Sequence, residues 1–294
     1  MAEPGLNTDG VAPLENMLDA SLRDIGIPPR PQVLDRIQHE MQQETPDFNR
    51  LANHISSDVS LAAGLIKTAN SPYFGFRTRA RTVSQALMML GLDLSARAVA
   101  GLILRKVFGT GPAMERFWDS SARIARVSGW LAQQFERRDG VGPEDAYTFG
   151  LFRDCGIPIL LRRFPTYAET LRLANNDPKR SFTEVESERH PTHHTLVGSM
   201  LAQSWWMPEE TCLAIRHHHD GAAIRRPGNG QPGATARMIA LTQLAELCVQ
   251  HATHRAQTHE WDKLGEACLD RLQLLEIEIP ELLNRAVPVA LAED

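Results

Sequence analysis

The sequence predicts an all-α protein with a two-lobed helical fold. Apolar residues recur at three- and four-residue spacing along most of the 294-residue chain, which is the pattern of helices with one buried face. Sustained alternation of apolar and polar residues, which would indicate half-buried strands, is almost absent. Capping residues and breaks rich in Gly or Pro separate the apolar stretches at intervals that suit short helices.

The N-terminal lobe is predicted over 14–110, after a flexible tail at 1–13 that is rich in Gly, Pro, Asn and Asp. Its first helix has the apolar face Leu14, Met17, Leu18 and Leu22. Three prolines within 27–31 end that helix, and the next presents Val33, Leu34, Ile37 and Met41. Asp47 and Asp58 are placed to cap two further short helices.

A stop follows at 70–75, because the residues Asn-Ser-Pro-Tyr-Phe-Gly cannot continue a helix. Thr82 and Gln85 form a capping-box pattern that opens a helix ending at Gly91. Asp93 then begins a longer apolar helix that reaches about Phe108. The segment 109–112 contains two glycines and a proline and is the best internal boundary in the chain.

The second lobe is predicted over 111–220. Its helices are expected at 113–136, 143–156, 165–175, 183–189, 191–206 and 208–219. The stretch 221–233, rich in Gly, Pro and Arg, is predicted to be a loop. Helices near 234–257 and 260–285 complete the segment 221–294, which we expect to pack on the second lobe.

The composition predicts a soluble, cytoplasmic protein. The net charge of -5, from 31 basic and 36 acidic residues, argues against broad electrostatic capture of nucleic acid. The 4 cysteines form no CxxC pair and suit free thiols in a reducing compartment. No apolar run approaches the ~20 residues that cross a bilayer, and the first residues lack a signal-peptide pattern. We therefore expect no membrane partner.

Two histidine clusters, at 190–194 and 217–219, follow an Asp154 that lies at the end of an apolar helix. Histidines and a carboxylate from several helices can hold a cation. Because consecutive helical residues are ~100° apart, at most one or two of the residues 217–219 can face one point. Pro191 is expected to begin a helix and to leave His190 outside it. The convergent set is therefore Asp154, His194 and one or both of His218 and His219.

The same residues have plainer interpretations. Histidines on helices are common as surface or hydrogen-bonded core residues, and Asp154 could cap a helix or form a salt bridge. Basic runs at 77–81, 162–163 and 225–226 would serve nucleic acid, but short basic runs in loops are usually solvated, so nucleic acid is an unlikely partner.

Ordered blocks across roughly 20–220 resemble the HDOD family, whose relatives are the HD and HD-GYP metal-dependent phosphohydrolases. The N-terminal blocks are IPPRP at 27–31, LIKTANSPYFG at 65–75 and TVSQAL at 82–87. The later blocks are HTLVG at 194–198, WMP at 206–208 and AIRHHHD at 214–220. The resemblance implies an HD-like helical second lobe.

The resemblance also implies lost metal ligands. In active relatives a first histidine and an adjacent His-Asp pair hold the metal; those histidine positions match Ser120 and Arg153, beside the retained Asp154. A guanidinium is a permanent cation and offers no lone pair to a metal. The resemblance therefore implies no catalytic residue and no cofactor beyond weak divalent-metal binding at the vestigial set Asp154, His194, His218 and His219.

The function that the resemblance implies is a non-catalytic regulatory module in bacterial signalling. It would act on an unidentified signalling protein or on a small ligand such as a nucleotide second messenger. An interlobe groove could place Asn70, Tyr73 and Phe74 near a ligand, although aromatic residues just after a helix, such as Tyr73 and Phe74, more often belong to the interlobe core. The alternative is a residual metal-dependent phosphohydrolase or phosphodiesterase acting on nucleotides.

Overall fold

The computed structural model describes residues 24–109, 111–135, 140–225, 233–255 and 257–292, and within these ranges the chain forms helices and no strand. The predicted all-α class is thereby confirmed. The predicted tail at 1–13 and the helix face from Leu14 to Leu22 lie outside the described residues. The predicted division into lobes stays a prediction, and the elements are described below in chain order.

The N-terminal elements are short helices that pack on one long helix. They are α2 (Gln32–Met41), α3 (Phe48–Ser56), α4 (Val59–Ala69), the 3-10 turn η2 (Pro72–Phe74) and α5 (Val83–Phe108). The predicted caps are present, since Asp47 accepts from the Arg50 amide at 2.9 Å and Thr82 accepts from the Gln85 amide at 3.2 Å. Gly91 has a φ of 74°, which breaks α5 where the sequence predicts two helices.

Helix α5 differs from the expectation that no stretch could cross a membrane. By length and composition alone, this one helix among the described residues is long and apolar enough to do so. In the fold it packs against α2, α3, α4 and α7, and its buried residues, such as Leu87, Val99 and Leu104, join the hydrophobic core. Contacts with the rest of the chain therefore account for the buried part of its apolar residues, whereas Met88 and Val107 are exposed.

The second group of helices runs from α6 to α12. Their bounds are α6 (Pro112–Gln134), α7 (Pro143–Phe152), α8 (Gly156–Arg163), α9 (Tyr167–Asn176), α10 (Phe182–Arg189), α11 (His194–Ser204) and α12 (Glu209–His217). The predicted helix at 143–156 is wrong in extent, because a turn at Arg153–Cys155 separates α7 from α8. The predicted start at Pro191 is also wrong: the His193 ring caps α11 by accepting from the Leu196 amide at 3.3 Å.

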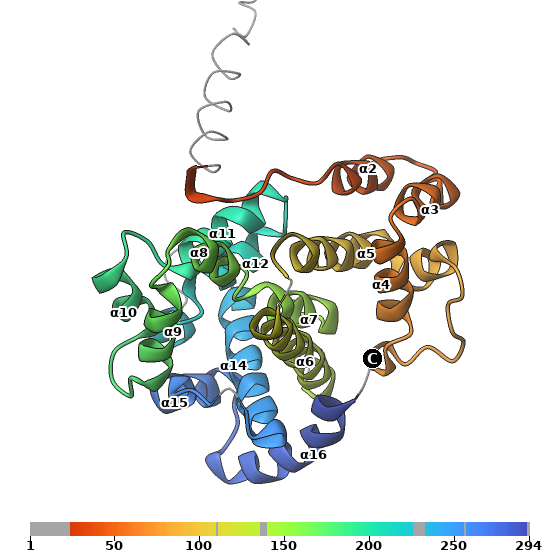
Figure 1. Cartoon of the computed structure of the whole chain (residues 1–294). Coiled ribbons are helices and arrows are strands. Elements are labelled where there is room, and N and C mark those ends of the chain that lie inside the picture. The colour runs from red at the N-terminus through yellow and green to blue at the C-terminus, as the bar shows by residue number, and fades with distance from the viewer. Residues whose placement is uncertain (1–23, 110, 136–139, 226–232, 256, 293–294) are drawn as a thin grey trace, which may run out of the picture.

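The C-terminal elements are α13 (Gly221–Arg225), α14 (Gly233–Thr253), α15 (Glu260–Leu272), η3 (Glu276–Glu278) and α16 (Ile279–Leu291). Helix α13 replaces the first part of the predicted loop at 221–233, and two helices replace the single one predicted at 260–285. Helix α15 ends at Gln273, which caps it in a left-handed conformation with a φ of 58°. Figure 1 shows α14 in the middle of this region, and it contacts α6, α7, α12, α15 and α16.

An aromatic contact joins the early helices to α6 and α7. The Tyr73 ring stacks on Tyr147 with a centroid distance of 5.2 Å. A Cβ atom at Gly129 would lie 2.2 Å from the Tyr73 hydroxyl, so only glycine leaves room for this ring on α6. Arg97 of α5 adds an ion pair to Asp145 of α7 at 2.9 Å. These contacts fix the first helices against the region that carries the site.

Candidate functional site

Four ionisable side chains meet where three helix ends converge. Asp154 lies in the turn between α7 and α8, and His194 is the first residue of α11. His218 and His219 directly follow the last residue of α12. Because the histidines stand at helix ends rather than within one continuous helix, both His218 and His219 can join the cluster. The structure thus brings together the whole set that the sequence singled out.

Glycine makes this convergence possible. A Cβ atom on Gly156 would lie 2.1 Å from the His194 carbonyl oxygen and 2.8 Å from the Gly198 amide nitrogen. No other residue type fits this distance, so α8 begins in direct contact with the first turn of α11. The Cys155 thiol also reaches the Gly198 carbonyl at 3.6 Å. The close approach carries Asp154, two residues earlier, to the His194 ring.

The ligand atoms of Asp154, His194, His218 and His219 all lie within 4.8 Å of one another. The Nε2 atoms of His194 and His218 are 3.3 Å apart. Asp154 Oδ1 lies 3.3 Å from His218 Nε2 and 3.6 Å from His194 Nε2. His194 and His218 are buried, whereas Asp154 is partly accessible. Three nitrogens and one oxygen at this spacing are a donor set that suits a four-coordinate divalent cation.

The outer nitrogen of each imidazole has its own acceptor. His194 Nδ1 contacts Glu186 Oε2 at 2.8 Å. His218 Nδ1 contacts the Ile215 carbonyl oxygen at 2.9 Å, and His219 Nδ1 contacts Glu260 Oε2 at 2.5 Å. This bond places the proton on Nδ1 and turns Nε2 toward the centre of the cluster. Metal-binding histidines in proteins are usually oriented by the same kind of partner. We call these three rings with Asp154 Oδ1 the imidazole half of the site.

Burial and neighbouring charges set the protonation of this half. Burial alone would raise the pKa of the Glu186 carboxyl, but His194 and the Tyr167 hydroxyl, which both donate to it, bring that pKa to about 2. Burial lowers the pKa of His218 to about 3, and the neighbouring His219 adds to this effect. Burial also acts to lower the pKa of His194, but the charge of Glu186 outweighs it and raises that pKa. His218 is therefore neutral, and its ring can accept at Nε2.

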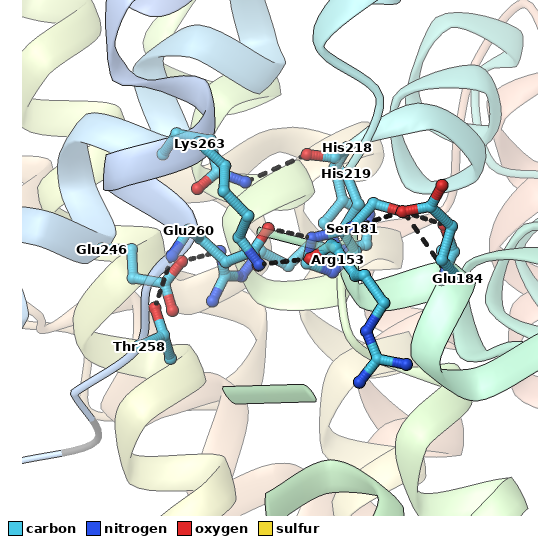
Figure 2. A network of polar contacts seen from close by, with 12 residues as sticks. Arg153, Ser181, Glu184, His218, His219, Glu246, Thr258, Glu260 and Lys263 are labelled. Atoms are coloured by element: carbon cyan, nitrogen blue, oxygen red, sulfur yellow. Dashed lines mark hydrogen bonds and ion pairs between the residues drawn. The ribbon is translucent and has the colours of Figure 1, made fainter. Parts of the chain in front are cut away.

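The other side of Asp154 is occupied by Arg153, which is 6% exposed. Arg153 Nε lies 3.1 Å from Asp154 Oδ2, and Arg153 Nη1 lies 2.8 Å from Glu246 Oε2 on α14. Burial works to raise the pKa of Asp154, but the Arg153 guanidinium holds it well below its ordinary value. Figure 2 shows Arg153 in the same network as Glu246 and Glu260. We call Arg153, Glu246 and Asp154 Oδ2 the guanidinium half.

A cavity of about 640 Å³ opens over the guanidinium half. It is bordered by α6, by the turn after α7, by α14 and by the start of α15. Its polar lining residues include Arg116, Asp119, Ser120, Arg123, Arg153, Asp154, Asn175, His219, Glu246, Gln250, Arg255, Thr258 and Glu260. A cavity of this volume is typical of small-molecule sites. Asp154 and His219 reach the cavity wall, whereas His194 and His218 are not part of its lining.

The two halves differ in whether they fit a metal. In the imidazole half, oriented Nε2 atoms and a carboxylate oxygen provide a complete donor set. In the guanidinium half, a permanent cation stands between the two carboxylates that would otherwise attract an ion. Ser120, the other position where the resemblance implies a lost ligand, lines the cavity on α6. The donors therefore fit one cation, in the imidazole half.

The other predicted residues lie elsewhere. The Asn70 amide binds Ala80 through both the Ala80 amide and carbonyl, at 2.7 and 2.9 Å, and so closes the loop between α4 and α5. Tyr73 and Phe74 form ring contacts with Tyr147. None of Asn70, Tyr73 and Phe74 is among the residues that line the cavity, and a ligand role for them stays a prediction. His190 contacts the Thr170 hydroxyl at 2.9 Å and lies outside the cluster, as expected.

Three carboxylates of the site were not found from the sequence. Glu186 lies on α10, Glu246 on α14 and Glu260 at the start of α15. Each contacts a site residue that is distant in sequence, and no spacing rule connects partners in this way. Their role is visible only in the fold: Glu186 and Glu260 are 0% and 3% exposed, and a glutamate is rarely buried without a partner.

The chain matches the family model of the HDOD domain over residues 27–221. It is 27% identical over 209 residues to an uncharacterised protein of Treponema pallidum, covering 66% of this chain and 38% of that protein. The chain thus spans well under half the length of that relative. Solved structures share the fold.

A candidate signal transduction protein of Marinobacter aquaeolei has a TM-score of 0.66 at 22% identity, over 97% of this chain and 65% of that one. An HDOD domain protein of unknown function from Geobacter sulfurreducens has a TM-score of 0.56 at 21% identity, over 95% and 100% of the two chains. A candidate phosphohydrolase of Shewanella amazonensis has a TM-score of 0.64 at 18% identity, over 93% and 96%.

Proposed function

Because the chain belongs to the HDOD domain family, we propose that it is a non-catalytic regulatory module of bacterial signal transduction, which acts by binding a protein partner or a small ligand. The observation that carries this proposal is the position of Arg153. Its buried guanidinium pairs with both Asp154 and Glu246 beneath the cavity. Where a hydrolase needs an activated water, this chain has a permanent cation that two carboxylates already neutralise.

A protein or small-ligand partner is favoured over nucleic acid. The net charge is -5, and Arg225 of one basic run is paired with Glu266 at 2.9 Å. We place the protein in the cytoplasm, and its four cysteines support this, since all are free and buried. No cofactor is required by the proposal, although weak divalent-metal binding at the imidazole half is compatible with it.

The test is a combined measurement of metal content and hydrolysis on the full chain. The protein is purified without chelator, and bis(p-nitrophenyl) phosphate is offered with added Mn²⁺ or Zn²⁺. We expect no turnover above that of Asp154→Ala, which removes the carboxylate common to both halves. Turnover in the wild type that disappears in Asp154→Ala would contradict the proposal. Bound metal without turnover would agree with it.

The second candidate is a residual metal-dependent phosphohydrolase or phosphodiesterase acting on nucleotides. The convergence of Asp154, His194, His218 and His219 within 4.8 Å favours it. A divalent cation held there would supply a Lewis acid and a more acidic water. The chain's own residues argue against it: His194 and His218 do not line the cavity, and Arg153 occupies the floor next to Asp154. The same hydrolysis assay decides between the two candidates.

A further inference from the structure

We propose that the cavity binds a nucleotide whose phosphate lies at the cavity rim and whose base lies on the floor, an orientation opposite to the one that hydrolysis at the floor would need. The inference rests on the proposed non-catalytic function. It follows from the distribution of charge along the cavity, from the distance between its two ends, and from the side chains of its wall.

The floor of the cavity is rich in carboxylates, and the cations near them are already paired with them. Three carboxylates lie there, those of Asp154, Glu246 and Glu260. Arg153 is shared by Asp154 and Glu246. Glu260 is bound by His219 and Lys263, as Figure 2 shows. A phosphate placed on this floor would meet carboxylates whose cations are already engaged, whereas N–H groups would find acceptors.

The rim has the reverse character. Arg116 on α6 and Arg255 just beyond α14 line the cavity and are exposed. Neither forms an ion pair with another described residue, whereas Arg123 is bound by Asp119 and by the Ala290 carbonyl. Guanidinium groups bind phosphate through paired N–H donors. The two arginines that have no carboxylate partner are thus those that a phosphate can reach first.

Along α14 the cavity lining extends over about the length of a nucleotide, and Arg255 follows the end of this helix. Glu246 and Thr253 both line the cavity along α14, and seven residues of helix correspond to about 10 Å. This separation matches the span from the base edge to the phosphate of a nucleoside monophosphate. The cavity volume of about 640 Å³ leaves room for such a ligand.

The wall between the two ends suits an aromatic base. The Phe182 ring lines the cavity and stacks on His219 at 4.8 Å with an interplanar angle of 16°. Phe117 and Ile157 add apolar surface. Every nucleobase can stack on an aromatic side chain, because each has a π-face. Its N–H edge then remains free to donate to the carboxylates of the floor.

The test is calorimetric titration of the full chain, without added metal, using guanosine 5′-monophosphate, guanosine and inorganic phosphate as probes. We expect the monophosphate to bind, and the double variant Arg116→Ala/Arg255→Ala to weaken that binding at least tenfold. Guanosine should bind equally to wild type and variant. The control Arg162→Ala/Arg172→Ala removes two exposed arginines outside the cavity lining and should change nothing.

A floor variant provides the second arm. Glu246→Gln replaces one acceptor by a group that also donates, and it should weaken the monophosphate and guanosine alike. Equal monophosphate affinities in wild type and in Arg116→Ala/Arg255→Ala, or no binding of any probe, would overturn the inference. Release of phosphate from the monophosphate during the titration would instead overturn the proposed function, so the two failures are distinguishable.

Discussion

Asp154 stands between two regions that contact the same carboxylate in different ways. On one side, three imidazoles are held by acceptors at Nδ1, and Nε2 of His194 and of His218 lies near Asp154 Oδ1. On the other, a guanidinium binds Asp154 Oδ2 and Glu246. The imidazoles can exchange a proton or a cation, but the guanidinium can do neither at ordinary pH. The comparison teaches that oriented imidazoles can stand beside a carboxylate whose charge a guanidinium already balances.

The largest effect is expected from breaking the guanidinium half. Arg153→Met leaves Asp154 and Glu246 near each other and partly buried without their cation. We expect the free energy of unfolding to fall by about 3–5 kcal/mol, as for other broken buried ion pairs, measured by urea denaturation. Arg153→Met/Glu246→Gln should recover part of the loss. A loss below about 1 kcal/mol for the single change would mean that Arg153 is not a structural counter-ion.

The next effect concerns the close contact between Gly156 of α8 and the first turn of α11, which brings Asp154 to His194. Gly156→Ala would place a Cβ atom 2.1 Å from the His194 carbonyl oxygen, which is backbone and cannot rotate away. Helix α8 must then move from α11, and we expect a destabilisation of about 3 kcal/mol in the same denaturation assay. Gly221→Ala is the matched control, since its Cβ would meet only side-chain atoms at ordinary contact distances, Leu264 at 3.4 Å and Arg225 at 3.9 Å. Equal stability of both variants would contradict the close contact.

A smaller effect should appear in the imidazole half. Zn²⁺ binding, measured by competition with a chromophoric chelator, should disappear in His218→Ala. It should weaken roughly tenfold to a hundredfold in Glu260→Ala, because His219 loses the acceptor that orients its ring. Glu266→Ala, which changes an exposed carboxylate paired with Arg225, should leave the affinity unchanged. If Glu260→Ala binds Zn²⁺ as tightly as the wild type, the imidazole half is not the site of binding.

The smallest effect is expected for an exposed ion pair, which serves as a comparison for the buried pair of Arg153 and Glu246. Arg180 and Glu188 form an ion pair in which both side chains are about half exposed. Exposed pairs contribute little because water solvates both charges, so Glu188→Ala should change the free energy of unfolding by less than about 0.5 kcal/mol. A value close to that of Arg153→Met would show that burial does not account for the difference between the two pairs.

Much of the fold and of the cluster could be predicted because the signals are local. Apolar periodicity and the caps at Asp47, Asp58 and Thr82 depend on neighbouring residues, and the structure has helices at those places. The boundary errors also have local causes. Pro191 resembled a helix start, but the His193 ring caps α11 instead, so the helix begins three residues later.

The partners of the site could not be predicted, because they depend on contacts between distant segments. Arg153 meets Glu246 across 93 residues, and His219 meets Glu260 across 41. With 217–219 predicted as part of one helix, at most two of these residues are expected to face one point. Helix α12 ends at His217, and the next two residues leave the helix. The sequence therefore predicted the histidines and Asp154 as candidates, but it did not identify Glu186 and Glu260, which orient two of the rings, or Glu246, the second partner of Arg153.

Helices α14 and α15 extend the site beyond the residues that match the family. The match to the family ends at residue 221, yet Glu246, Arg255 and Glu260 come from the chain beyond it. The histidine cluster thus lies inside the matched residues, whereas the cavity lining is shared between the matched residues, such as Arg116 and Asp154, and the residues beyond them. Substitution of the exposed Arg255 would therefore change the cavity lining and leave the histidine cluster intact, whereas Glu260 contributes to both the lining and the cluster.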